Sequence, residues 1–423
     1  MQKRDDSWTH IFSTDYIDVM LMKKRIFKSG LPEDLNMRSQ VWKLLLGYYT
    51  PLKNDWQVID ENCLRQYTKY VREIYPNVSS ESLDKVFEAT WQTKYATNVF
   101  ENTISTFNLN DDETKRMRTI EKDIIRTVIG APYNRDEPIR HDLAFRRILF
   151  ILSLVNGGVS YVQGMNNICN VFYTQFASSQ DKPDYKKVEA ETFGCMFMLI
   201  DQMRMWFLPS FDNQKNGIKD SMSQIERVLT KTDKQYADKL KSIGVGPELF
   251  VFRWLTLLCC MEFPLSETLR YWDFFFLDLD NFPLVKATCV GILLVLKKDL
   301  LGLNFSQTLS FLQNLPKIEF GKVMKKTKQI LKKAKYHIRP FSQSQSSSFL
   351  RIQLTSQSPE KLESETSEMF SCSSKTEIGK STKESDSQSA ASEMTRSTKV
   401  RIDKSKRKAI NFKLKKTLFD FEN

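Results

Sequence analysis

A nearly uninterrupted apolar run at residues 143–155 constrains the fold of this chain more than any other feature. Its exceptions are Arg146, Arg147 and Ser153. A run of this length and composition predicts a helix that is buried on most of its surface. The Asn-Gly-Gly at 156–158 predicts the end of that helix, since glycine adopts the left-handed conformation of many helix stops. We therefore expect a buried helix that fixes the distance between the two segments flanking it.

Two short polar segments flank this run, at 120–127 and 161–166, and each carries a residue suited to phosphate chemistry. Hydrolysis of GTP needs compensation of the charge that develops on the phosphate oxygens, and a polar group that orients the attacking water. Arg126 suits the first role, because a guanidinium is always charged and presents a rigid fork of donors. Gln163 suits the second, because a carboxamide can accept from the water and donate to the phosphate.

Taken singly, these residues have more ordinary explanations. Asp123 lies three residues before Arg126, a spacing at which a carboxylate and a guanidinium commonly form a structural ion pair on one helical turn. A Tyr-x-Gln triplet such as Tyr161 to Gln163 carries little information alone. Only the combination of both segments across a buried helix makes the pattern specific.

That combination resembles the TBC-domain family of Rab GTPase-activating proteins. The family carries an Ile-x-x-Asp-x-x-Arg signal and then a Tyr-x-Gln-Gly-Met-Asn signal across an apolar helix. The matching residues here are Ile120, Asp123 and Arg126, then Tyr161, Gln163, Gly164, Met165 and Asn166. An upstream family signal is matched by Gly30, Pro32, Arg38 and Trp42. Later matches at 252–255 and 269–273 extend the resemblance over about 30–315, and they favour the subgroup of TBC domain family member thirteen.

The resemblance implies a GTPase activator that regulates vesicle trafficking, not an enzyme acting on its own substrate. Arg126 and Gln163 are then the catalytic fingers, which complete in trans the active site of a GTP-bound Rab. The Rab carries the GTP and Mg, so the chain itself is expected to need no cofactor and no metal. The supporting residues are Asp123, Tyr161, Thr127, Gly164, Asn166, Arg38 and Trp42.

The supporting residues are expected to act in different ways. We expect Asp123 to aim the arginine, and Tyr161 to pack and orient its loop. Arg38 and Trp42 are four apart and share a helical face, so bracing the core is their simplest role. The sequence departs from the family in two loops, where Pro132 comes late and Gly157 replaces a frequent proline.

The remaining pattern predicts an all-α fold. Only 14 Gly and 13 Pro occur in 423 residues, and no long run alternates with period two. We expect an amphipathic helix at 11–28 and short helices and loops in a variable insertion at 52–119. Its acidic cluster Asn110–Glu113 is expected to be a solvated loop or a helix start. Further helices are expected at 188–207, 220–230, 234–242, 247–261, 266–277, 282–300 and 306–314.

Composition changes near residue 315. Residues 317–339 hold nine basic residues and one acidic residue, and 341–423 hold fifteen basic and eleven acidic residues. The net charge of +12 therefore lies entirely in the C-terminal part. Eighteen serines in 341–400 predict disorder. We expect a helical extension at 1–29, the TBC domain at 30–315, a basic helical segment at 316–340 and a disordered tail at 341–423.

The basic segments at 317–339 and 400–416 predict binding to anionic membrane surfaces, which would bring the chain to membrane-attached Rabs. A basic amphipathic helix is one interpretation of 400–421, and a solvated flexible tail is the other. No segment reaches the length of a spanning helix, and the N-terminus lacks a signal core. We expect a cytoplasmic protein that is peripheral on endomembranes at most.

Other chemistries are disfavoured. No P-loop signature occurs, the three His are far apart, and seven Cys form no metal-binding cluster; the pair at 259–260 is expected in an apolar helix. Two alternatives remain beside the GTPase activator. One is a catalytically silent Rab-binding or scaffold protein of the same fold. The other is a nucleic-acid or membrane-surface protein driven by the basic tail, although that charge has no groove-reading motif and nucleic acid is not expected.

Overall fold

The computed structural model describes residues 6–74, 111–127, 142–156 and 158–340. The chain divides into two units, Met1–Leu350 and Arg351–Asn423, and every described residue belongs to the first. The expectations for the tail at 341–423, for the loop around Pro132 and for 75–110 therefore lie outside the described residues.

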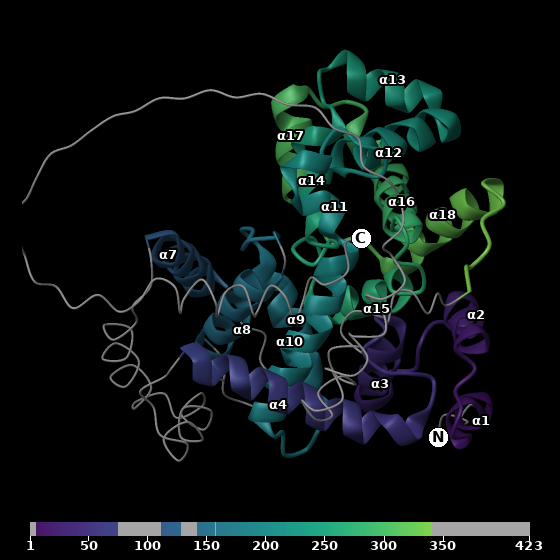
Figure 1. The fold of residues 1–423 in the computed structure, drawn as a ribbon. Coiled ribbons are helices and arrows are strands. Elements are labelled where there is room, and N and C mark those ends of the chain that lie inside the picture. The colour runs from purple at the N-terminus through teal and green to yellow at the C-terminus, as the bar shows by residue number, and fades with distance from the viewer. Residues whose placement is uncertain (1–5, 75–110, 128–141, 157, 341–423) are drawn as a thin grey trace, which may run out of the picture. The chain divides into compact units, whose positions relative to one another are not determined.

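The described part of the chain is helical (Figure 1). It contains no β-strand, and its pairing of Tyr16 with Leu52 is an isolated bridge. The predicted all-α class is confirmed. Within these ranges, no helix is both long and apolar enough to cross a bilayer. The helices are α1 (Asp6–Ser13), α2 (Val19–Ser29), α3 (Leu35–Leu45), η1 (Lys53–Asp55), α4 (Trp56–Ile74), α7 (Asp111–Arg126), α8 (Asp142–Val155), α9 (Met165–Ser178), α10 (Tyr185–Gln202), α11 (Arg204–Phe207), η2 (Pro209–Phe211), α12 (Ile218–Thr232), α13 (Lys234–Ser242), η3 (Pro247–Leu249), α14 (Val251–Thr256), α15 (Leu265–Phe275), α16 (Pro283–Leu300), α17 (Phe305–Gln313) and α18 (Phe320–Lys333).

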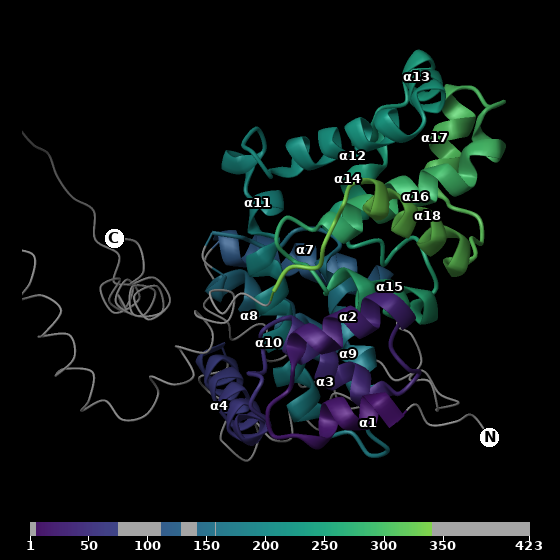
Figure 2. The ribbon, with the colours of Figure 1, turned by 90° about the vertical axis from the view of Figure 1, so that its right-hand side faces the viewer.

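Helix α9 packs against both α3 and α15 (Figure 2), and an aromatic cluster holds the three helices together. The Trp42 ring lies 5.7 Å from Phe172 and 5.6 Å from Trp272 between centroids, and the last two rings are 5.2 Å apart. All three side chains are fully buried. Tilted and edge-on aromatic pairs of this kind contribute beyond their buried area, so this cluster fixes how α9 sits in the fold.

A buried ion pair crosses the same cluster. Arg38 Nε lies 3.0 Å from Asp273 Oδ1, and Trp42 Nε1 donates to the same oxygen at 2.8 Å. Burial raises the pKa of Asp273, and the charge of Arg38 opposes that rise. Because Arg38 and Trp42 are buried and bound within the chain, they brace the core and do not face a partner.

The predicted helix at 143–155 is α8, which ends at Val155 as expected. Its buried face includes one charge that the apolar pattern did not explain. Arg147 Nε donates to Glu189 Oε2 of α10 at 3.0 Å, its Nη2 contacts the other oxygen, and Tyr67 of α4 donates to Oε2 at 2.9 Å. A buried charge needs such partners, and these bonds join α8 to α4 and α10.

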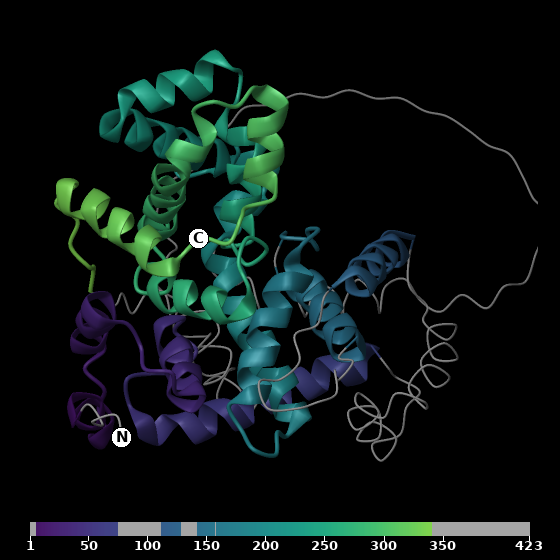
Figure 3. The same cartoon turned by 180° about the vertical axis from the view of Figure 1, so that it is seen from behind.

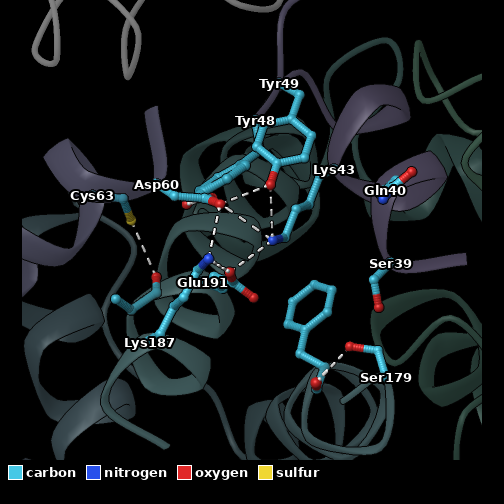
Figure 4. A network of polar contacts seen from close by, with 12 residues as sticks. Ser39, Gln40, Lys43, Tyr48, Tyr49, Asp60, Cys63, Ser179, Lys187 and Glu191 are labelled. Atoms are coloured by element: carbon cyan, nitrogen blue, oxygen red, sulfur yellow. Dashed lines mark hydrogen bonds and ion pairs between the residues drawn. The ribbon is translucent and has the colours of Figure 1, made fainter. Parts of the chain in front are cut away.

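A second buried network connects α3, α4 and α10 (Figure 4). Lys43 Nζ lies 2.9 Å from Glu191 Oε1 and 3.7 Å from Asp60 Oδ1, and it donates to the Tyr49 hydroxyl at 3.2 Å. Burial alone would lower the pKa of Lys43, but Glu191, Tyr49 and Asp60 together raise it. Lys43 is therefore charged at neutral pH, and its network anchors α4 against α10.

Two expectations for the N-terminal half are wrong. The region 11–28 is not one helix, because Asp18 caps the start of α2 by accepting from Leu21 N at 2.8 Å and separates it from α1. The region 52–74 does not consist of short helices and loops. After the single turn of η1, it forms the 19-residue helix α4, which is buried at Cys63, Tyr67 and Val71. The acidic residues near 111 start α7, as one of the two interpretations expected.

The predicted helix at 247–261 is also wrong. The segment forms η3, then the six-residue α14, and then a turn in which Leu258 and Cys259 have positive φ angles of 47° and 56°. Cys259 N bonds Trp254 O at 2.8 Å, and Trp272 Nε1 holds Leu258 O at 3.0 Å. These tertiary contacts stabilise the left-handed turn, so the cysteine pair lies beyond the helix.

The remaining helix predictions agree with the structure except at one place. The predicted helix at 188–207 is two helices, because α10 ends at Gln202 and α11 begins at Arg204. Met203 N still bonds Leu199 O at 3.0 Å, so the break is slight.

We predict that Arg38→Met lowers the free energy of unfolding by roughly 3–5 kcal/mol, because it leaves the Asp273 carboxylate buried without its ion-pair partner. The pKa of Asp273 should then rise further. Between the pKa of the unfolded carboxyl and this raised value, the folded variant binds more protons than the unfolded one. Its deficit relative to wild type should therefore grow as pH rises and shrink as pH falls.

Urea unfolding in mildly acidic and in neutral buffer measures this deficit. The matched control is Arg204→Met, which breaks the half-exposed Arg204–Asp201 pair at 2.8 Å and should cost less than about 1 kcal/mol. Similar losses for both variants, with no pH dependence, would contradict a stabilising role for the buried pair.

Candidate functional site

The first motif segment lies in the last turn of α7. Met117, Ile120 and Ile124 are buried at a spacing of three to four residues and face α8 and α9. This packing fixes the helix axis and places Asp123 in the buried region too. Arg126 is the last residue of α7, and its side chain is 65% exposed.

Asp123 is the centre of a hydrogen-bond network at the end of α7. Its Oδ2 accepts from the Tyr161 hydroxyl at 2.7 Å, and its Oδ1 accepts from Arg126 Nη2 at 3.4 Å. Burial, followed by the contact with Asp123, raises the pKa of Tyr161. The phenol is therefore neutral and donates to the carboxylate. The predicted contact between Asp123 and Arg126 is present.

Asn166 closes this network from the start of α9. Its Nδ2 donates to Thr127 Oγ1 at 2.6 Å and to Asp123 O at 3.3 Å, while Thr127 Oγ1 donates to Asp123 O at 2.9 Å. Asn166 Oδ1 lies 3.2 Å from the Tyr161 hydroxyl. The two motif segments, separated by α8 in sequence, are therefore joined in space.

Gln163 stands at the corner of a tight turn. Met165 N bonds Val162 O at 3.1 Å, and Gly164 has φ 101° and ψ −14°. A left-handed residue in the second central position is typical of a type II turn, and glycine is preferred there. This geometry leaves the Gln163 side chain exposed directly before α9 begins.

Gly164 is also required by its surroundings. A Cβ at this position would lie 2.7 Å from Cδ2 of Leu257, which follows α14. Leu257 is itself buried, so it packs on the bare glycine backbone. The turn after α14 thereby supports the turn that presents Gln163. This contact could not be predicted from the sequence, because the predicted continuous helix at 247–261 would have placed Leu257 differently.

The guanidinium of Arg126 has donors left over. Its Nε donates to Lys122 O at 3.0 Å, and one Nη contacts Asp123. A guanidinium has five N–H groups, and in the described part of the chain the others have no partner. The arrangement holds the arginine at its base and leaves its outer edge open to a ligand.

The structure thus groups most of the predicted site residues and separates two of them. Asp123, Arg126, Thr127, Tyr161 and Asn166 share the network, with Gly164 and Gln163 in the adjoining turn. Arg38 and Trp42 lie instead in the buried core around Asp273.

One residue beside the site was missed by the motif analysis. Ile125 immediately precedes Arg126, and it is 79% exposed. The hydrophobic spacing in α7 places Ile120 and Ile124 on the buried face of the helix. By the same spacing, Ile125 lies off that face. Its place next to the arginine makes it a candidate contact for a partner protein.

Comparison with known proteins identifies the family. The family model of the Rab-GTPase-TBC domain matches residues 35–301, which is more than half of the chain. This chain belongs to the Rab-GTPase-TBC family. It is 26% identical to mouse TBC1 domain family member 13 over 365 residues, covering 71% of this chain and 91% of that protein. It is 28% identical to TBC1 domain family member 22B of Macaca fascicularis over 307 residues, covering 69% and 53% of the two chains.

A solved structure shares the fold. The crystal structure of the Ypt/Rab-GAP domain of Gyp1p superimposes with a TM-score of 0.61 at 18% identity, covering 78% of this chain and 97% of that chain. The predicted resemblance to the TBC family, including the thirteen subgroup, is confirmed by these matches. The matched range 35–301 contains both segments of the site in this TBC domain.

We predict that Gly164→Ala destabilises the TBC domain more than Gly30→Ala does. Both glycines have positive φ, 101° and 80°, but a Cβ at Gly30 meets nothing within 4 Å. The control should cost about 1–2 kcal/mol through backbone strain alone. Gly164→Ala should cost roughly 1–3 kcal/mol more through overpacking against Leu257.

Urea unfolding measures both losses. Leu257→Ala should cost less in the Gly164→Ala background than in wild type, because the new methyl group partly fills the cavity that Leu257→Ala leaves. Equal losses for the two glycine variants would show that Leu257 does not restrict this position.

Proposed function

We propose that this chain is a GTPase-activating protein for Rab-family small GTPases. In this proposal Arg126 and Gln163 enter the active site of a partner Rab, which carries the GTP and Mg. The observation that carries the proposal is the network around buried Asp123, because it fastens the arginine segment to the glutamine segment while both of those side chains stay exposed.

Arg126 would stabilise the charge that develops on the transferring phosphate. Its donors to Lys122 O and Asp123 hold the base of the guanidinium, so the outer N–H groups are oriented before the partner arrives. Preorganised donors need no reorganisation when the charge develops, which is why they lower the barrier. In this proposal Asp123 is a positioning residue, because it acts through the arginine that it bonds.

Gln163 would orient the attacking water. Its turn is held from below by Leu257 and continued by α9, whose Asn166 belongs to the Asp123 network. The carboxamide can then accept a hydrogen bond from water and donate one to a phosphate oxygen. It would stand in for the glutamine that a GTPase ordinarily supplies itself.

A catalytically silent Rab-binding protein of the same fold is the alternative. It needs neither an open guanidinium nor an exposed carboxamide, whereas this chain presents both. Stimulated GTP hydrolysis, screened with the full chain against a panel of GTP-loaded Rabs, separates the two functions. The activator proposal requires at least one Rab to respond, and Rab binding without any acceleration would favour the silent alternative.

Arg126→Ala should lower the maximal rate of stimulated hydrolysis by roughly 10³–10⁵-fold. Arg126→Lys should fail nearly as badly, because lysine keeps the charge and loses the planar fork. Gln163→Ala should also strongly lower the maximal rate of stimulated hydrolysis. Binding of the GTP-bound Rab should change less than the rate does, since these contacts form mainly in the transition state. Single-turnover phosphate release measures the rates.

The matched control for this series is Arg118→Ala, which removes an exposed arginine two turns earlier on α7. It should leave the rate within a few-fold of wild type. Near-normal rates for Arg126→Ala and Gln163→Ala, on folded protein, would overturn the two-finger mechanism.

Asp123→Ala should slow stimulated hydrolysis by less than Arg126→Ala does, on the order of 10²-fold, because a misplaced group still retains its charge. Tyr161→Phe removes only the hydroxyl that binds Asp123 and should cost less again. The same phosphate-release assay ranks the variants, with melting curves to establish that each is folded. A loss for Asp123→Ala equal to that for Arg126→Ala, with a normal melting curve, would indicate a direct role for the carboxylate.

A further inference from the structure

Helix α18 is amphipathic, and the fold already uses its apolar face. Val323, Ile330 and Leu331 are buried, and the helix packs along α16 (Figure 3). The approach is close at Gly291 of α16, where a Cβ would lie 2.5 Å from Thr327 Oγ1 and 3.2 Å from Val323 O. The apolar residues of α18 are therefore not free to enter a lipid bilayer.

The opposite face of α18 is a stripe of lysines. Residues three and four apart share a helical face, and the exposed members of this stripe are Lys322, Lys325, Lys326, Lys332 and Lys333. Lys322 pairs with Glu319 at 3.0 Å. Among the residues the structure describes, no carboxylate lies within ion-pair distance of the other four.

A neighbouring carboxylate does not neutralise the stripe. Asp233 lies at the junction of α12 and α13 and lines a small polar hollow together with Lys326 and Lys333. Its Oδ2 lies 2.5 Å from Lys297 Nζ, and its Oδ1 accepts from Tyr236 N at 3.1 Å. Because Asp233 is already paired, the lysines of α18 keep most of their positive potential.

We propose that the lysine face of α18, formed by Lys325, Lys326, Lys332 and Lys333, binds the surface of an anionic lipid bilayer. The residues before 317 carry no net charge, so this helix concentrates the positive charge of the described chain. The contact is electrostatic alone, since the apolar face is buried. None of these four lysines belongs to the Asp123 network, and the proposal does not depend on the proposed function.

A lipid surface fits this face better than a nucleic acid does. The exposed stripe contains no arginine and no aromatic residue. Proteins that hold single-stranded nucleic acid combine a basic groove with aromatic stacking. Lysine is a compact point charge with no planar fork, and attraction to anionic lipid needs only such charges within a Debye length of the surface.

The test uses the full chain and cosedimentation with vesicles of equal parts phosphatidylserine and phosphatidylcholine. Replacing Lys325, Lys326 and Lys333 together by Gln should weaken the partition coefficient by about 100-fold, because each lysine near an anionic surface contributes on the order of fivefold. Replacing the same three by Arg should preserve binding. A truncation after residue 314 is a poorer test, because it deletes the whole of α18 and with it the packing of α18 on α16.

A matched control removes the same charge elsewhere. Arg65, Lys69 and Arg72 form an exposed basic stripe on α4 with the same helical spacing, and their triple Gln variant should bind almost as wild type does. Wild-type binding should fall at high salt and be absent on pure phosphatidylcholine.

Three outcomes would overturn the proposal. Unchanged binding by the α18 variant would assign vesicle binding to another segment, such as 400–416. Equal losses in both triple variants would show that net charge alone matters. An unchanged vesicle affinity with a lost affinity for single-stranded RNA, titrated in parallel, would assign the face to nucleic acid. None of these outcomes bears on GTP hydrolysis, which is measured without vesicles.

Discussion

The site depends on the contacts that the Asp123 carboxylate makes. It is buried, yet it receives the Tyr161 hydroxyl on one oxygen and the Arg126 guanidinium near the other. Two chain segments 38 residues apart thus meet at a single side chain. This carboxylate links the arginine side chain to the segment that leads into the glutamine turn. The backbone contacts of Asn166 and Thr127 then make the junction rigid.

The rest of the domain keeps this junction in register. Buried α8 spans the interval between the two segments, and the Arg147–Glu189 pair ties it to α10. The aromatic cluster around Trp42 fixes α9, whose first turn carries Asn166. Leu257 supports the Gln163 turn from the other side. Rigid elements therefore hold both exposed side chains at their bases, which is the arrangement that transition-state stabilisation requires.

Sequence reasoning succeeded where information is local. Periodicity and composition predicted the helical class, the burial and end of α8, and the contact three residues apart between Asp123 and Arg126. It failed where tertiary contacts override local preference. The left-handed Leu258 and Cys259 end α14 because Trp272 holds the Leu258 carbonyl, and no periodic pattern reveals that bond. The partners of buried Arg147 and Lys43 lie far away in the chain for the same reason.

In the proposed mechanism, Gln163 replaces the glutamine of the GTPase. The most direct measurement is single-turnover phosphate release by a responsive Rab whose own catalytic glutamine has been replaced by alanine. If Gln163 takes this role, the wild-type chain still accelerates hydrolysis by this Rab strongly, and Gln163→Ala abolishes the acceleration. Failure of the wild-type chain to stimulate this Rab, while it stimulates the unmodified one, would show that Gln163 does not replace the GTPase glutamine.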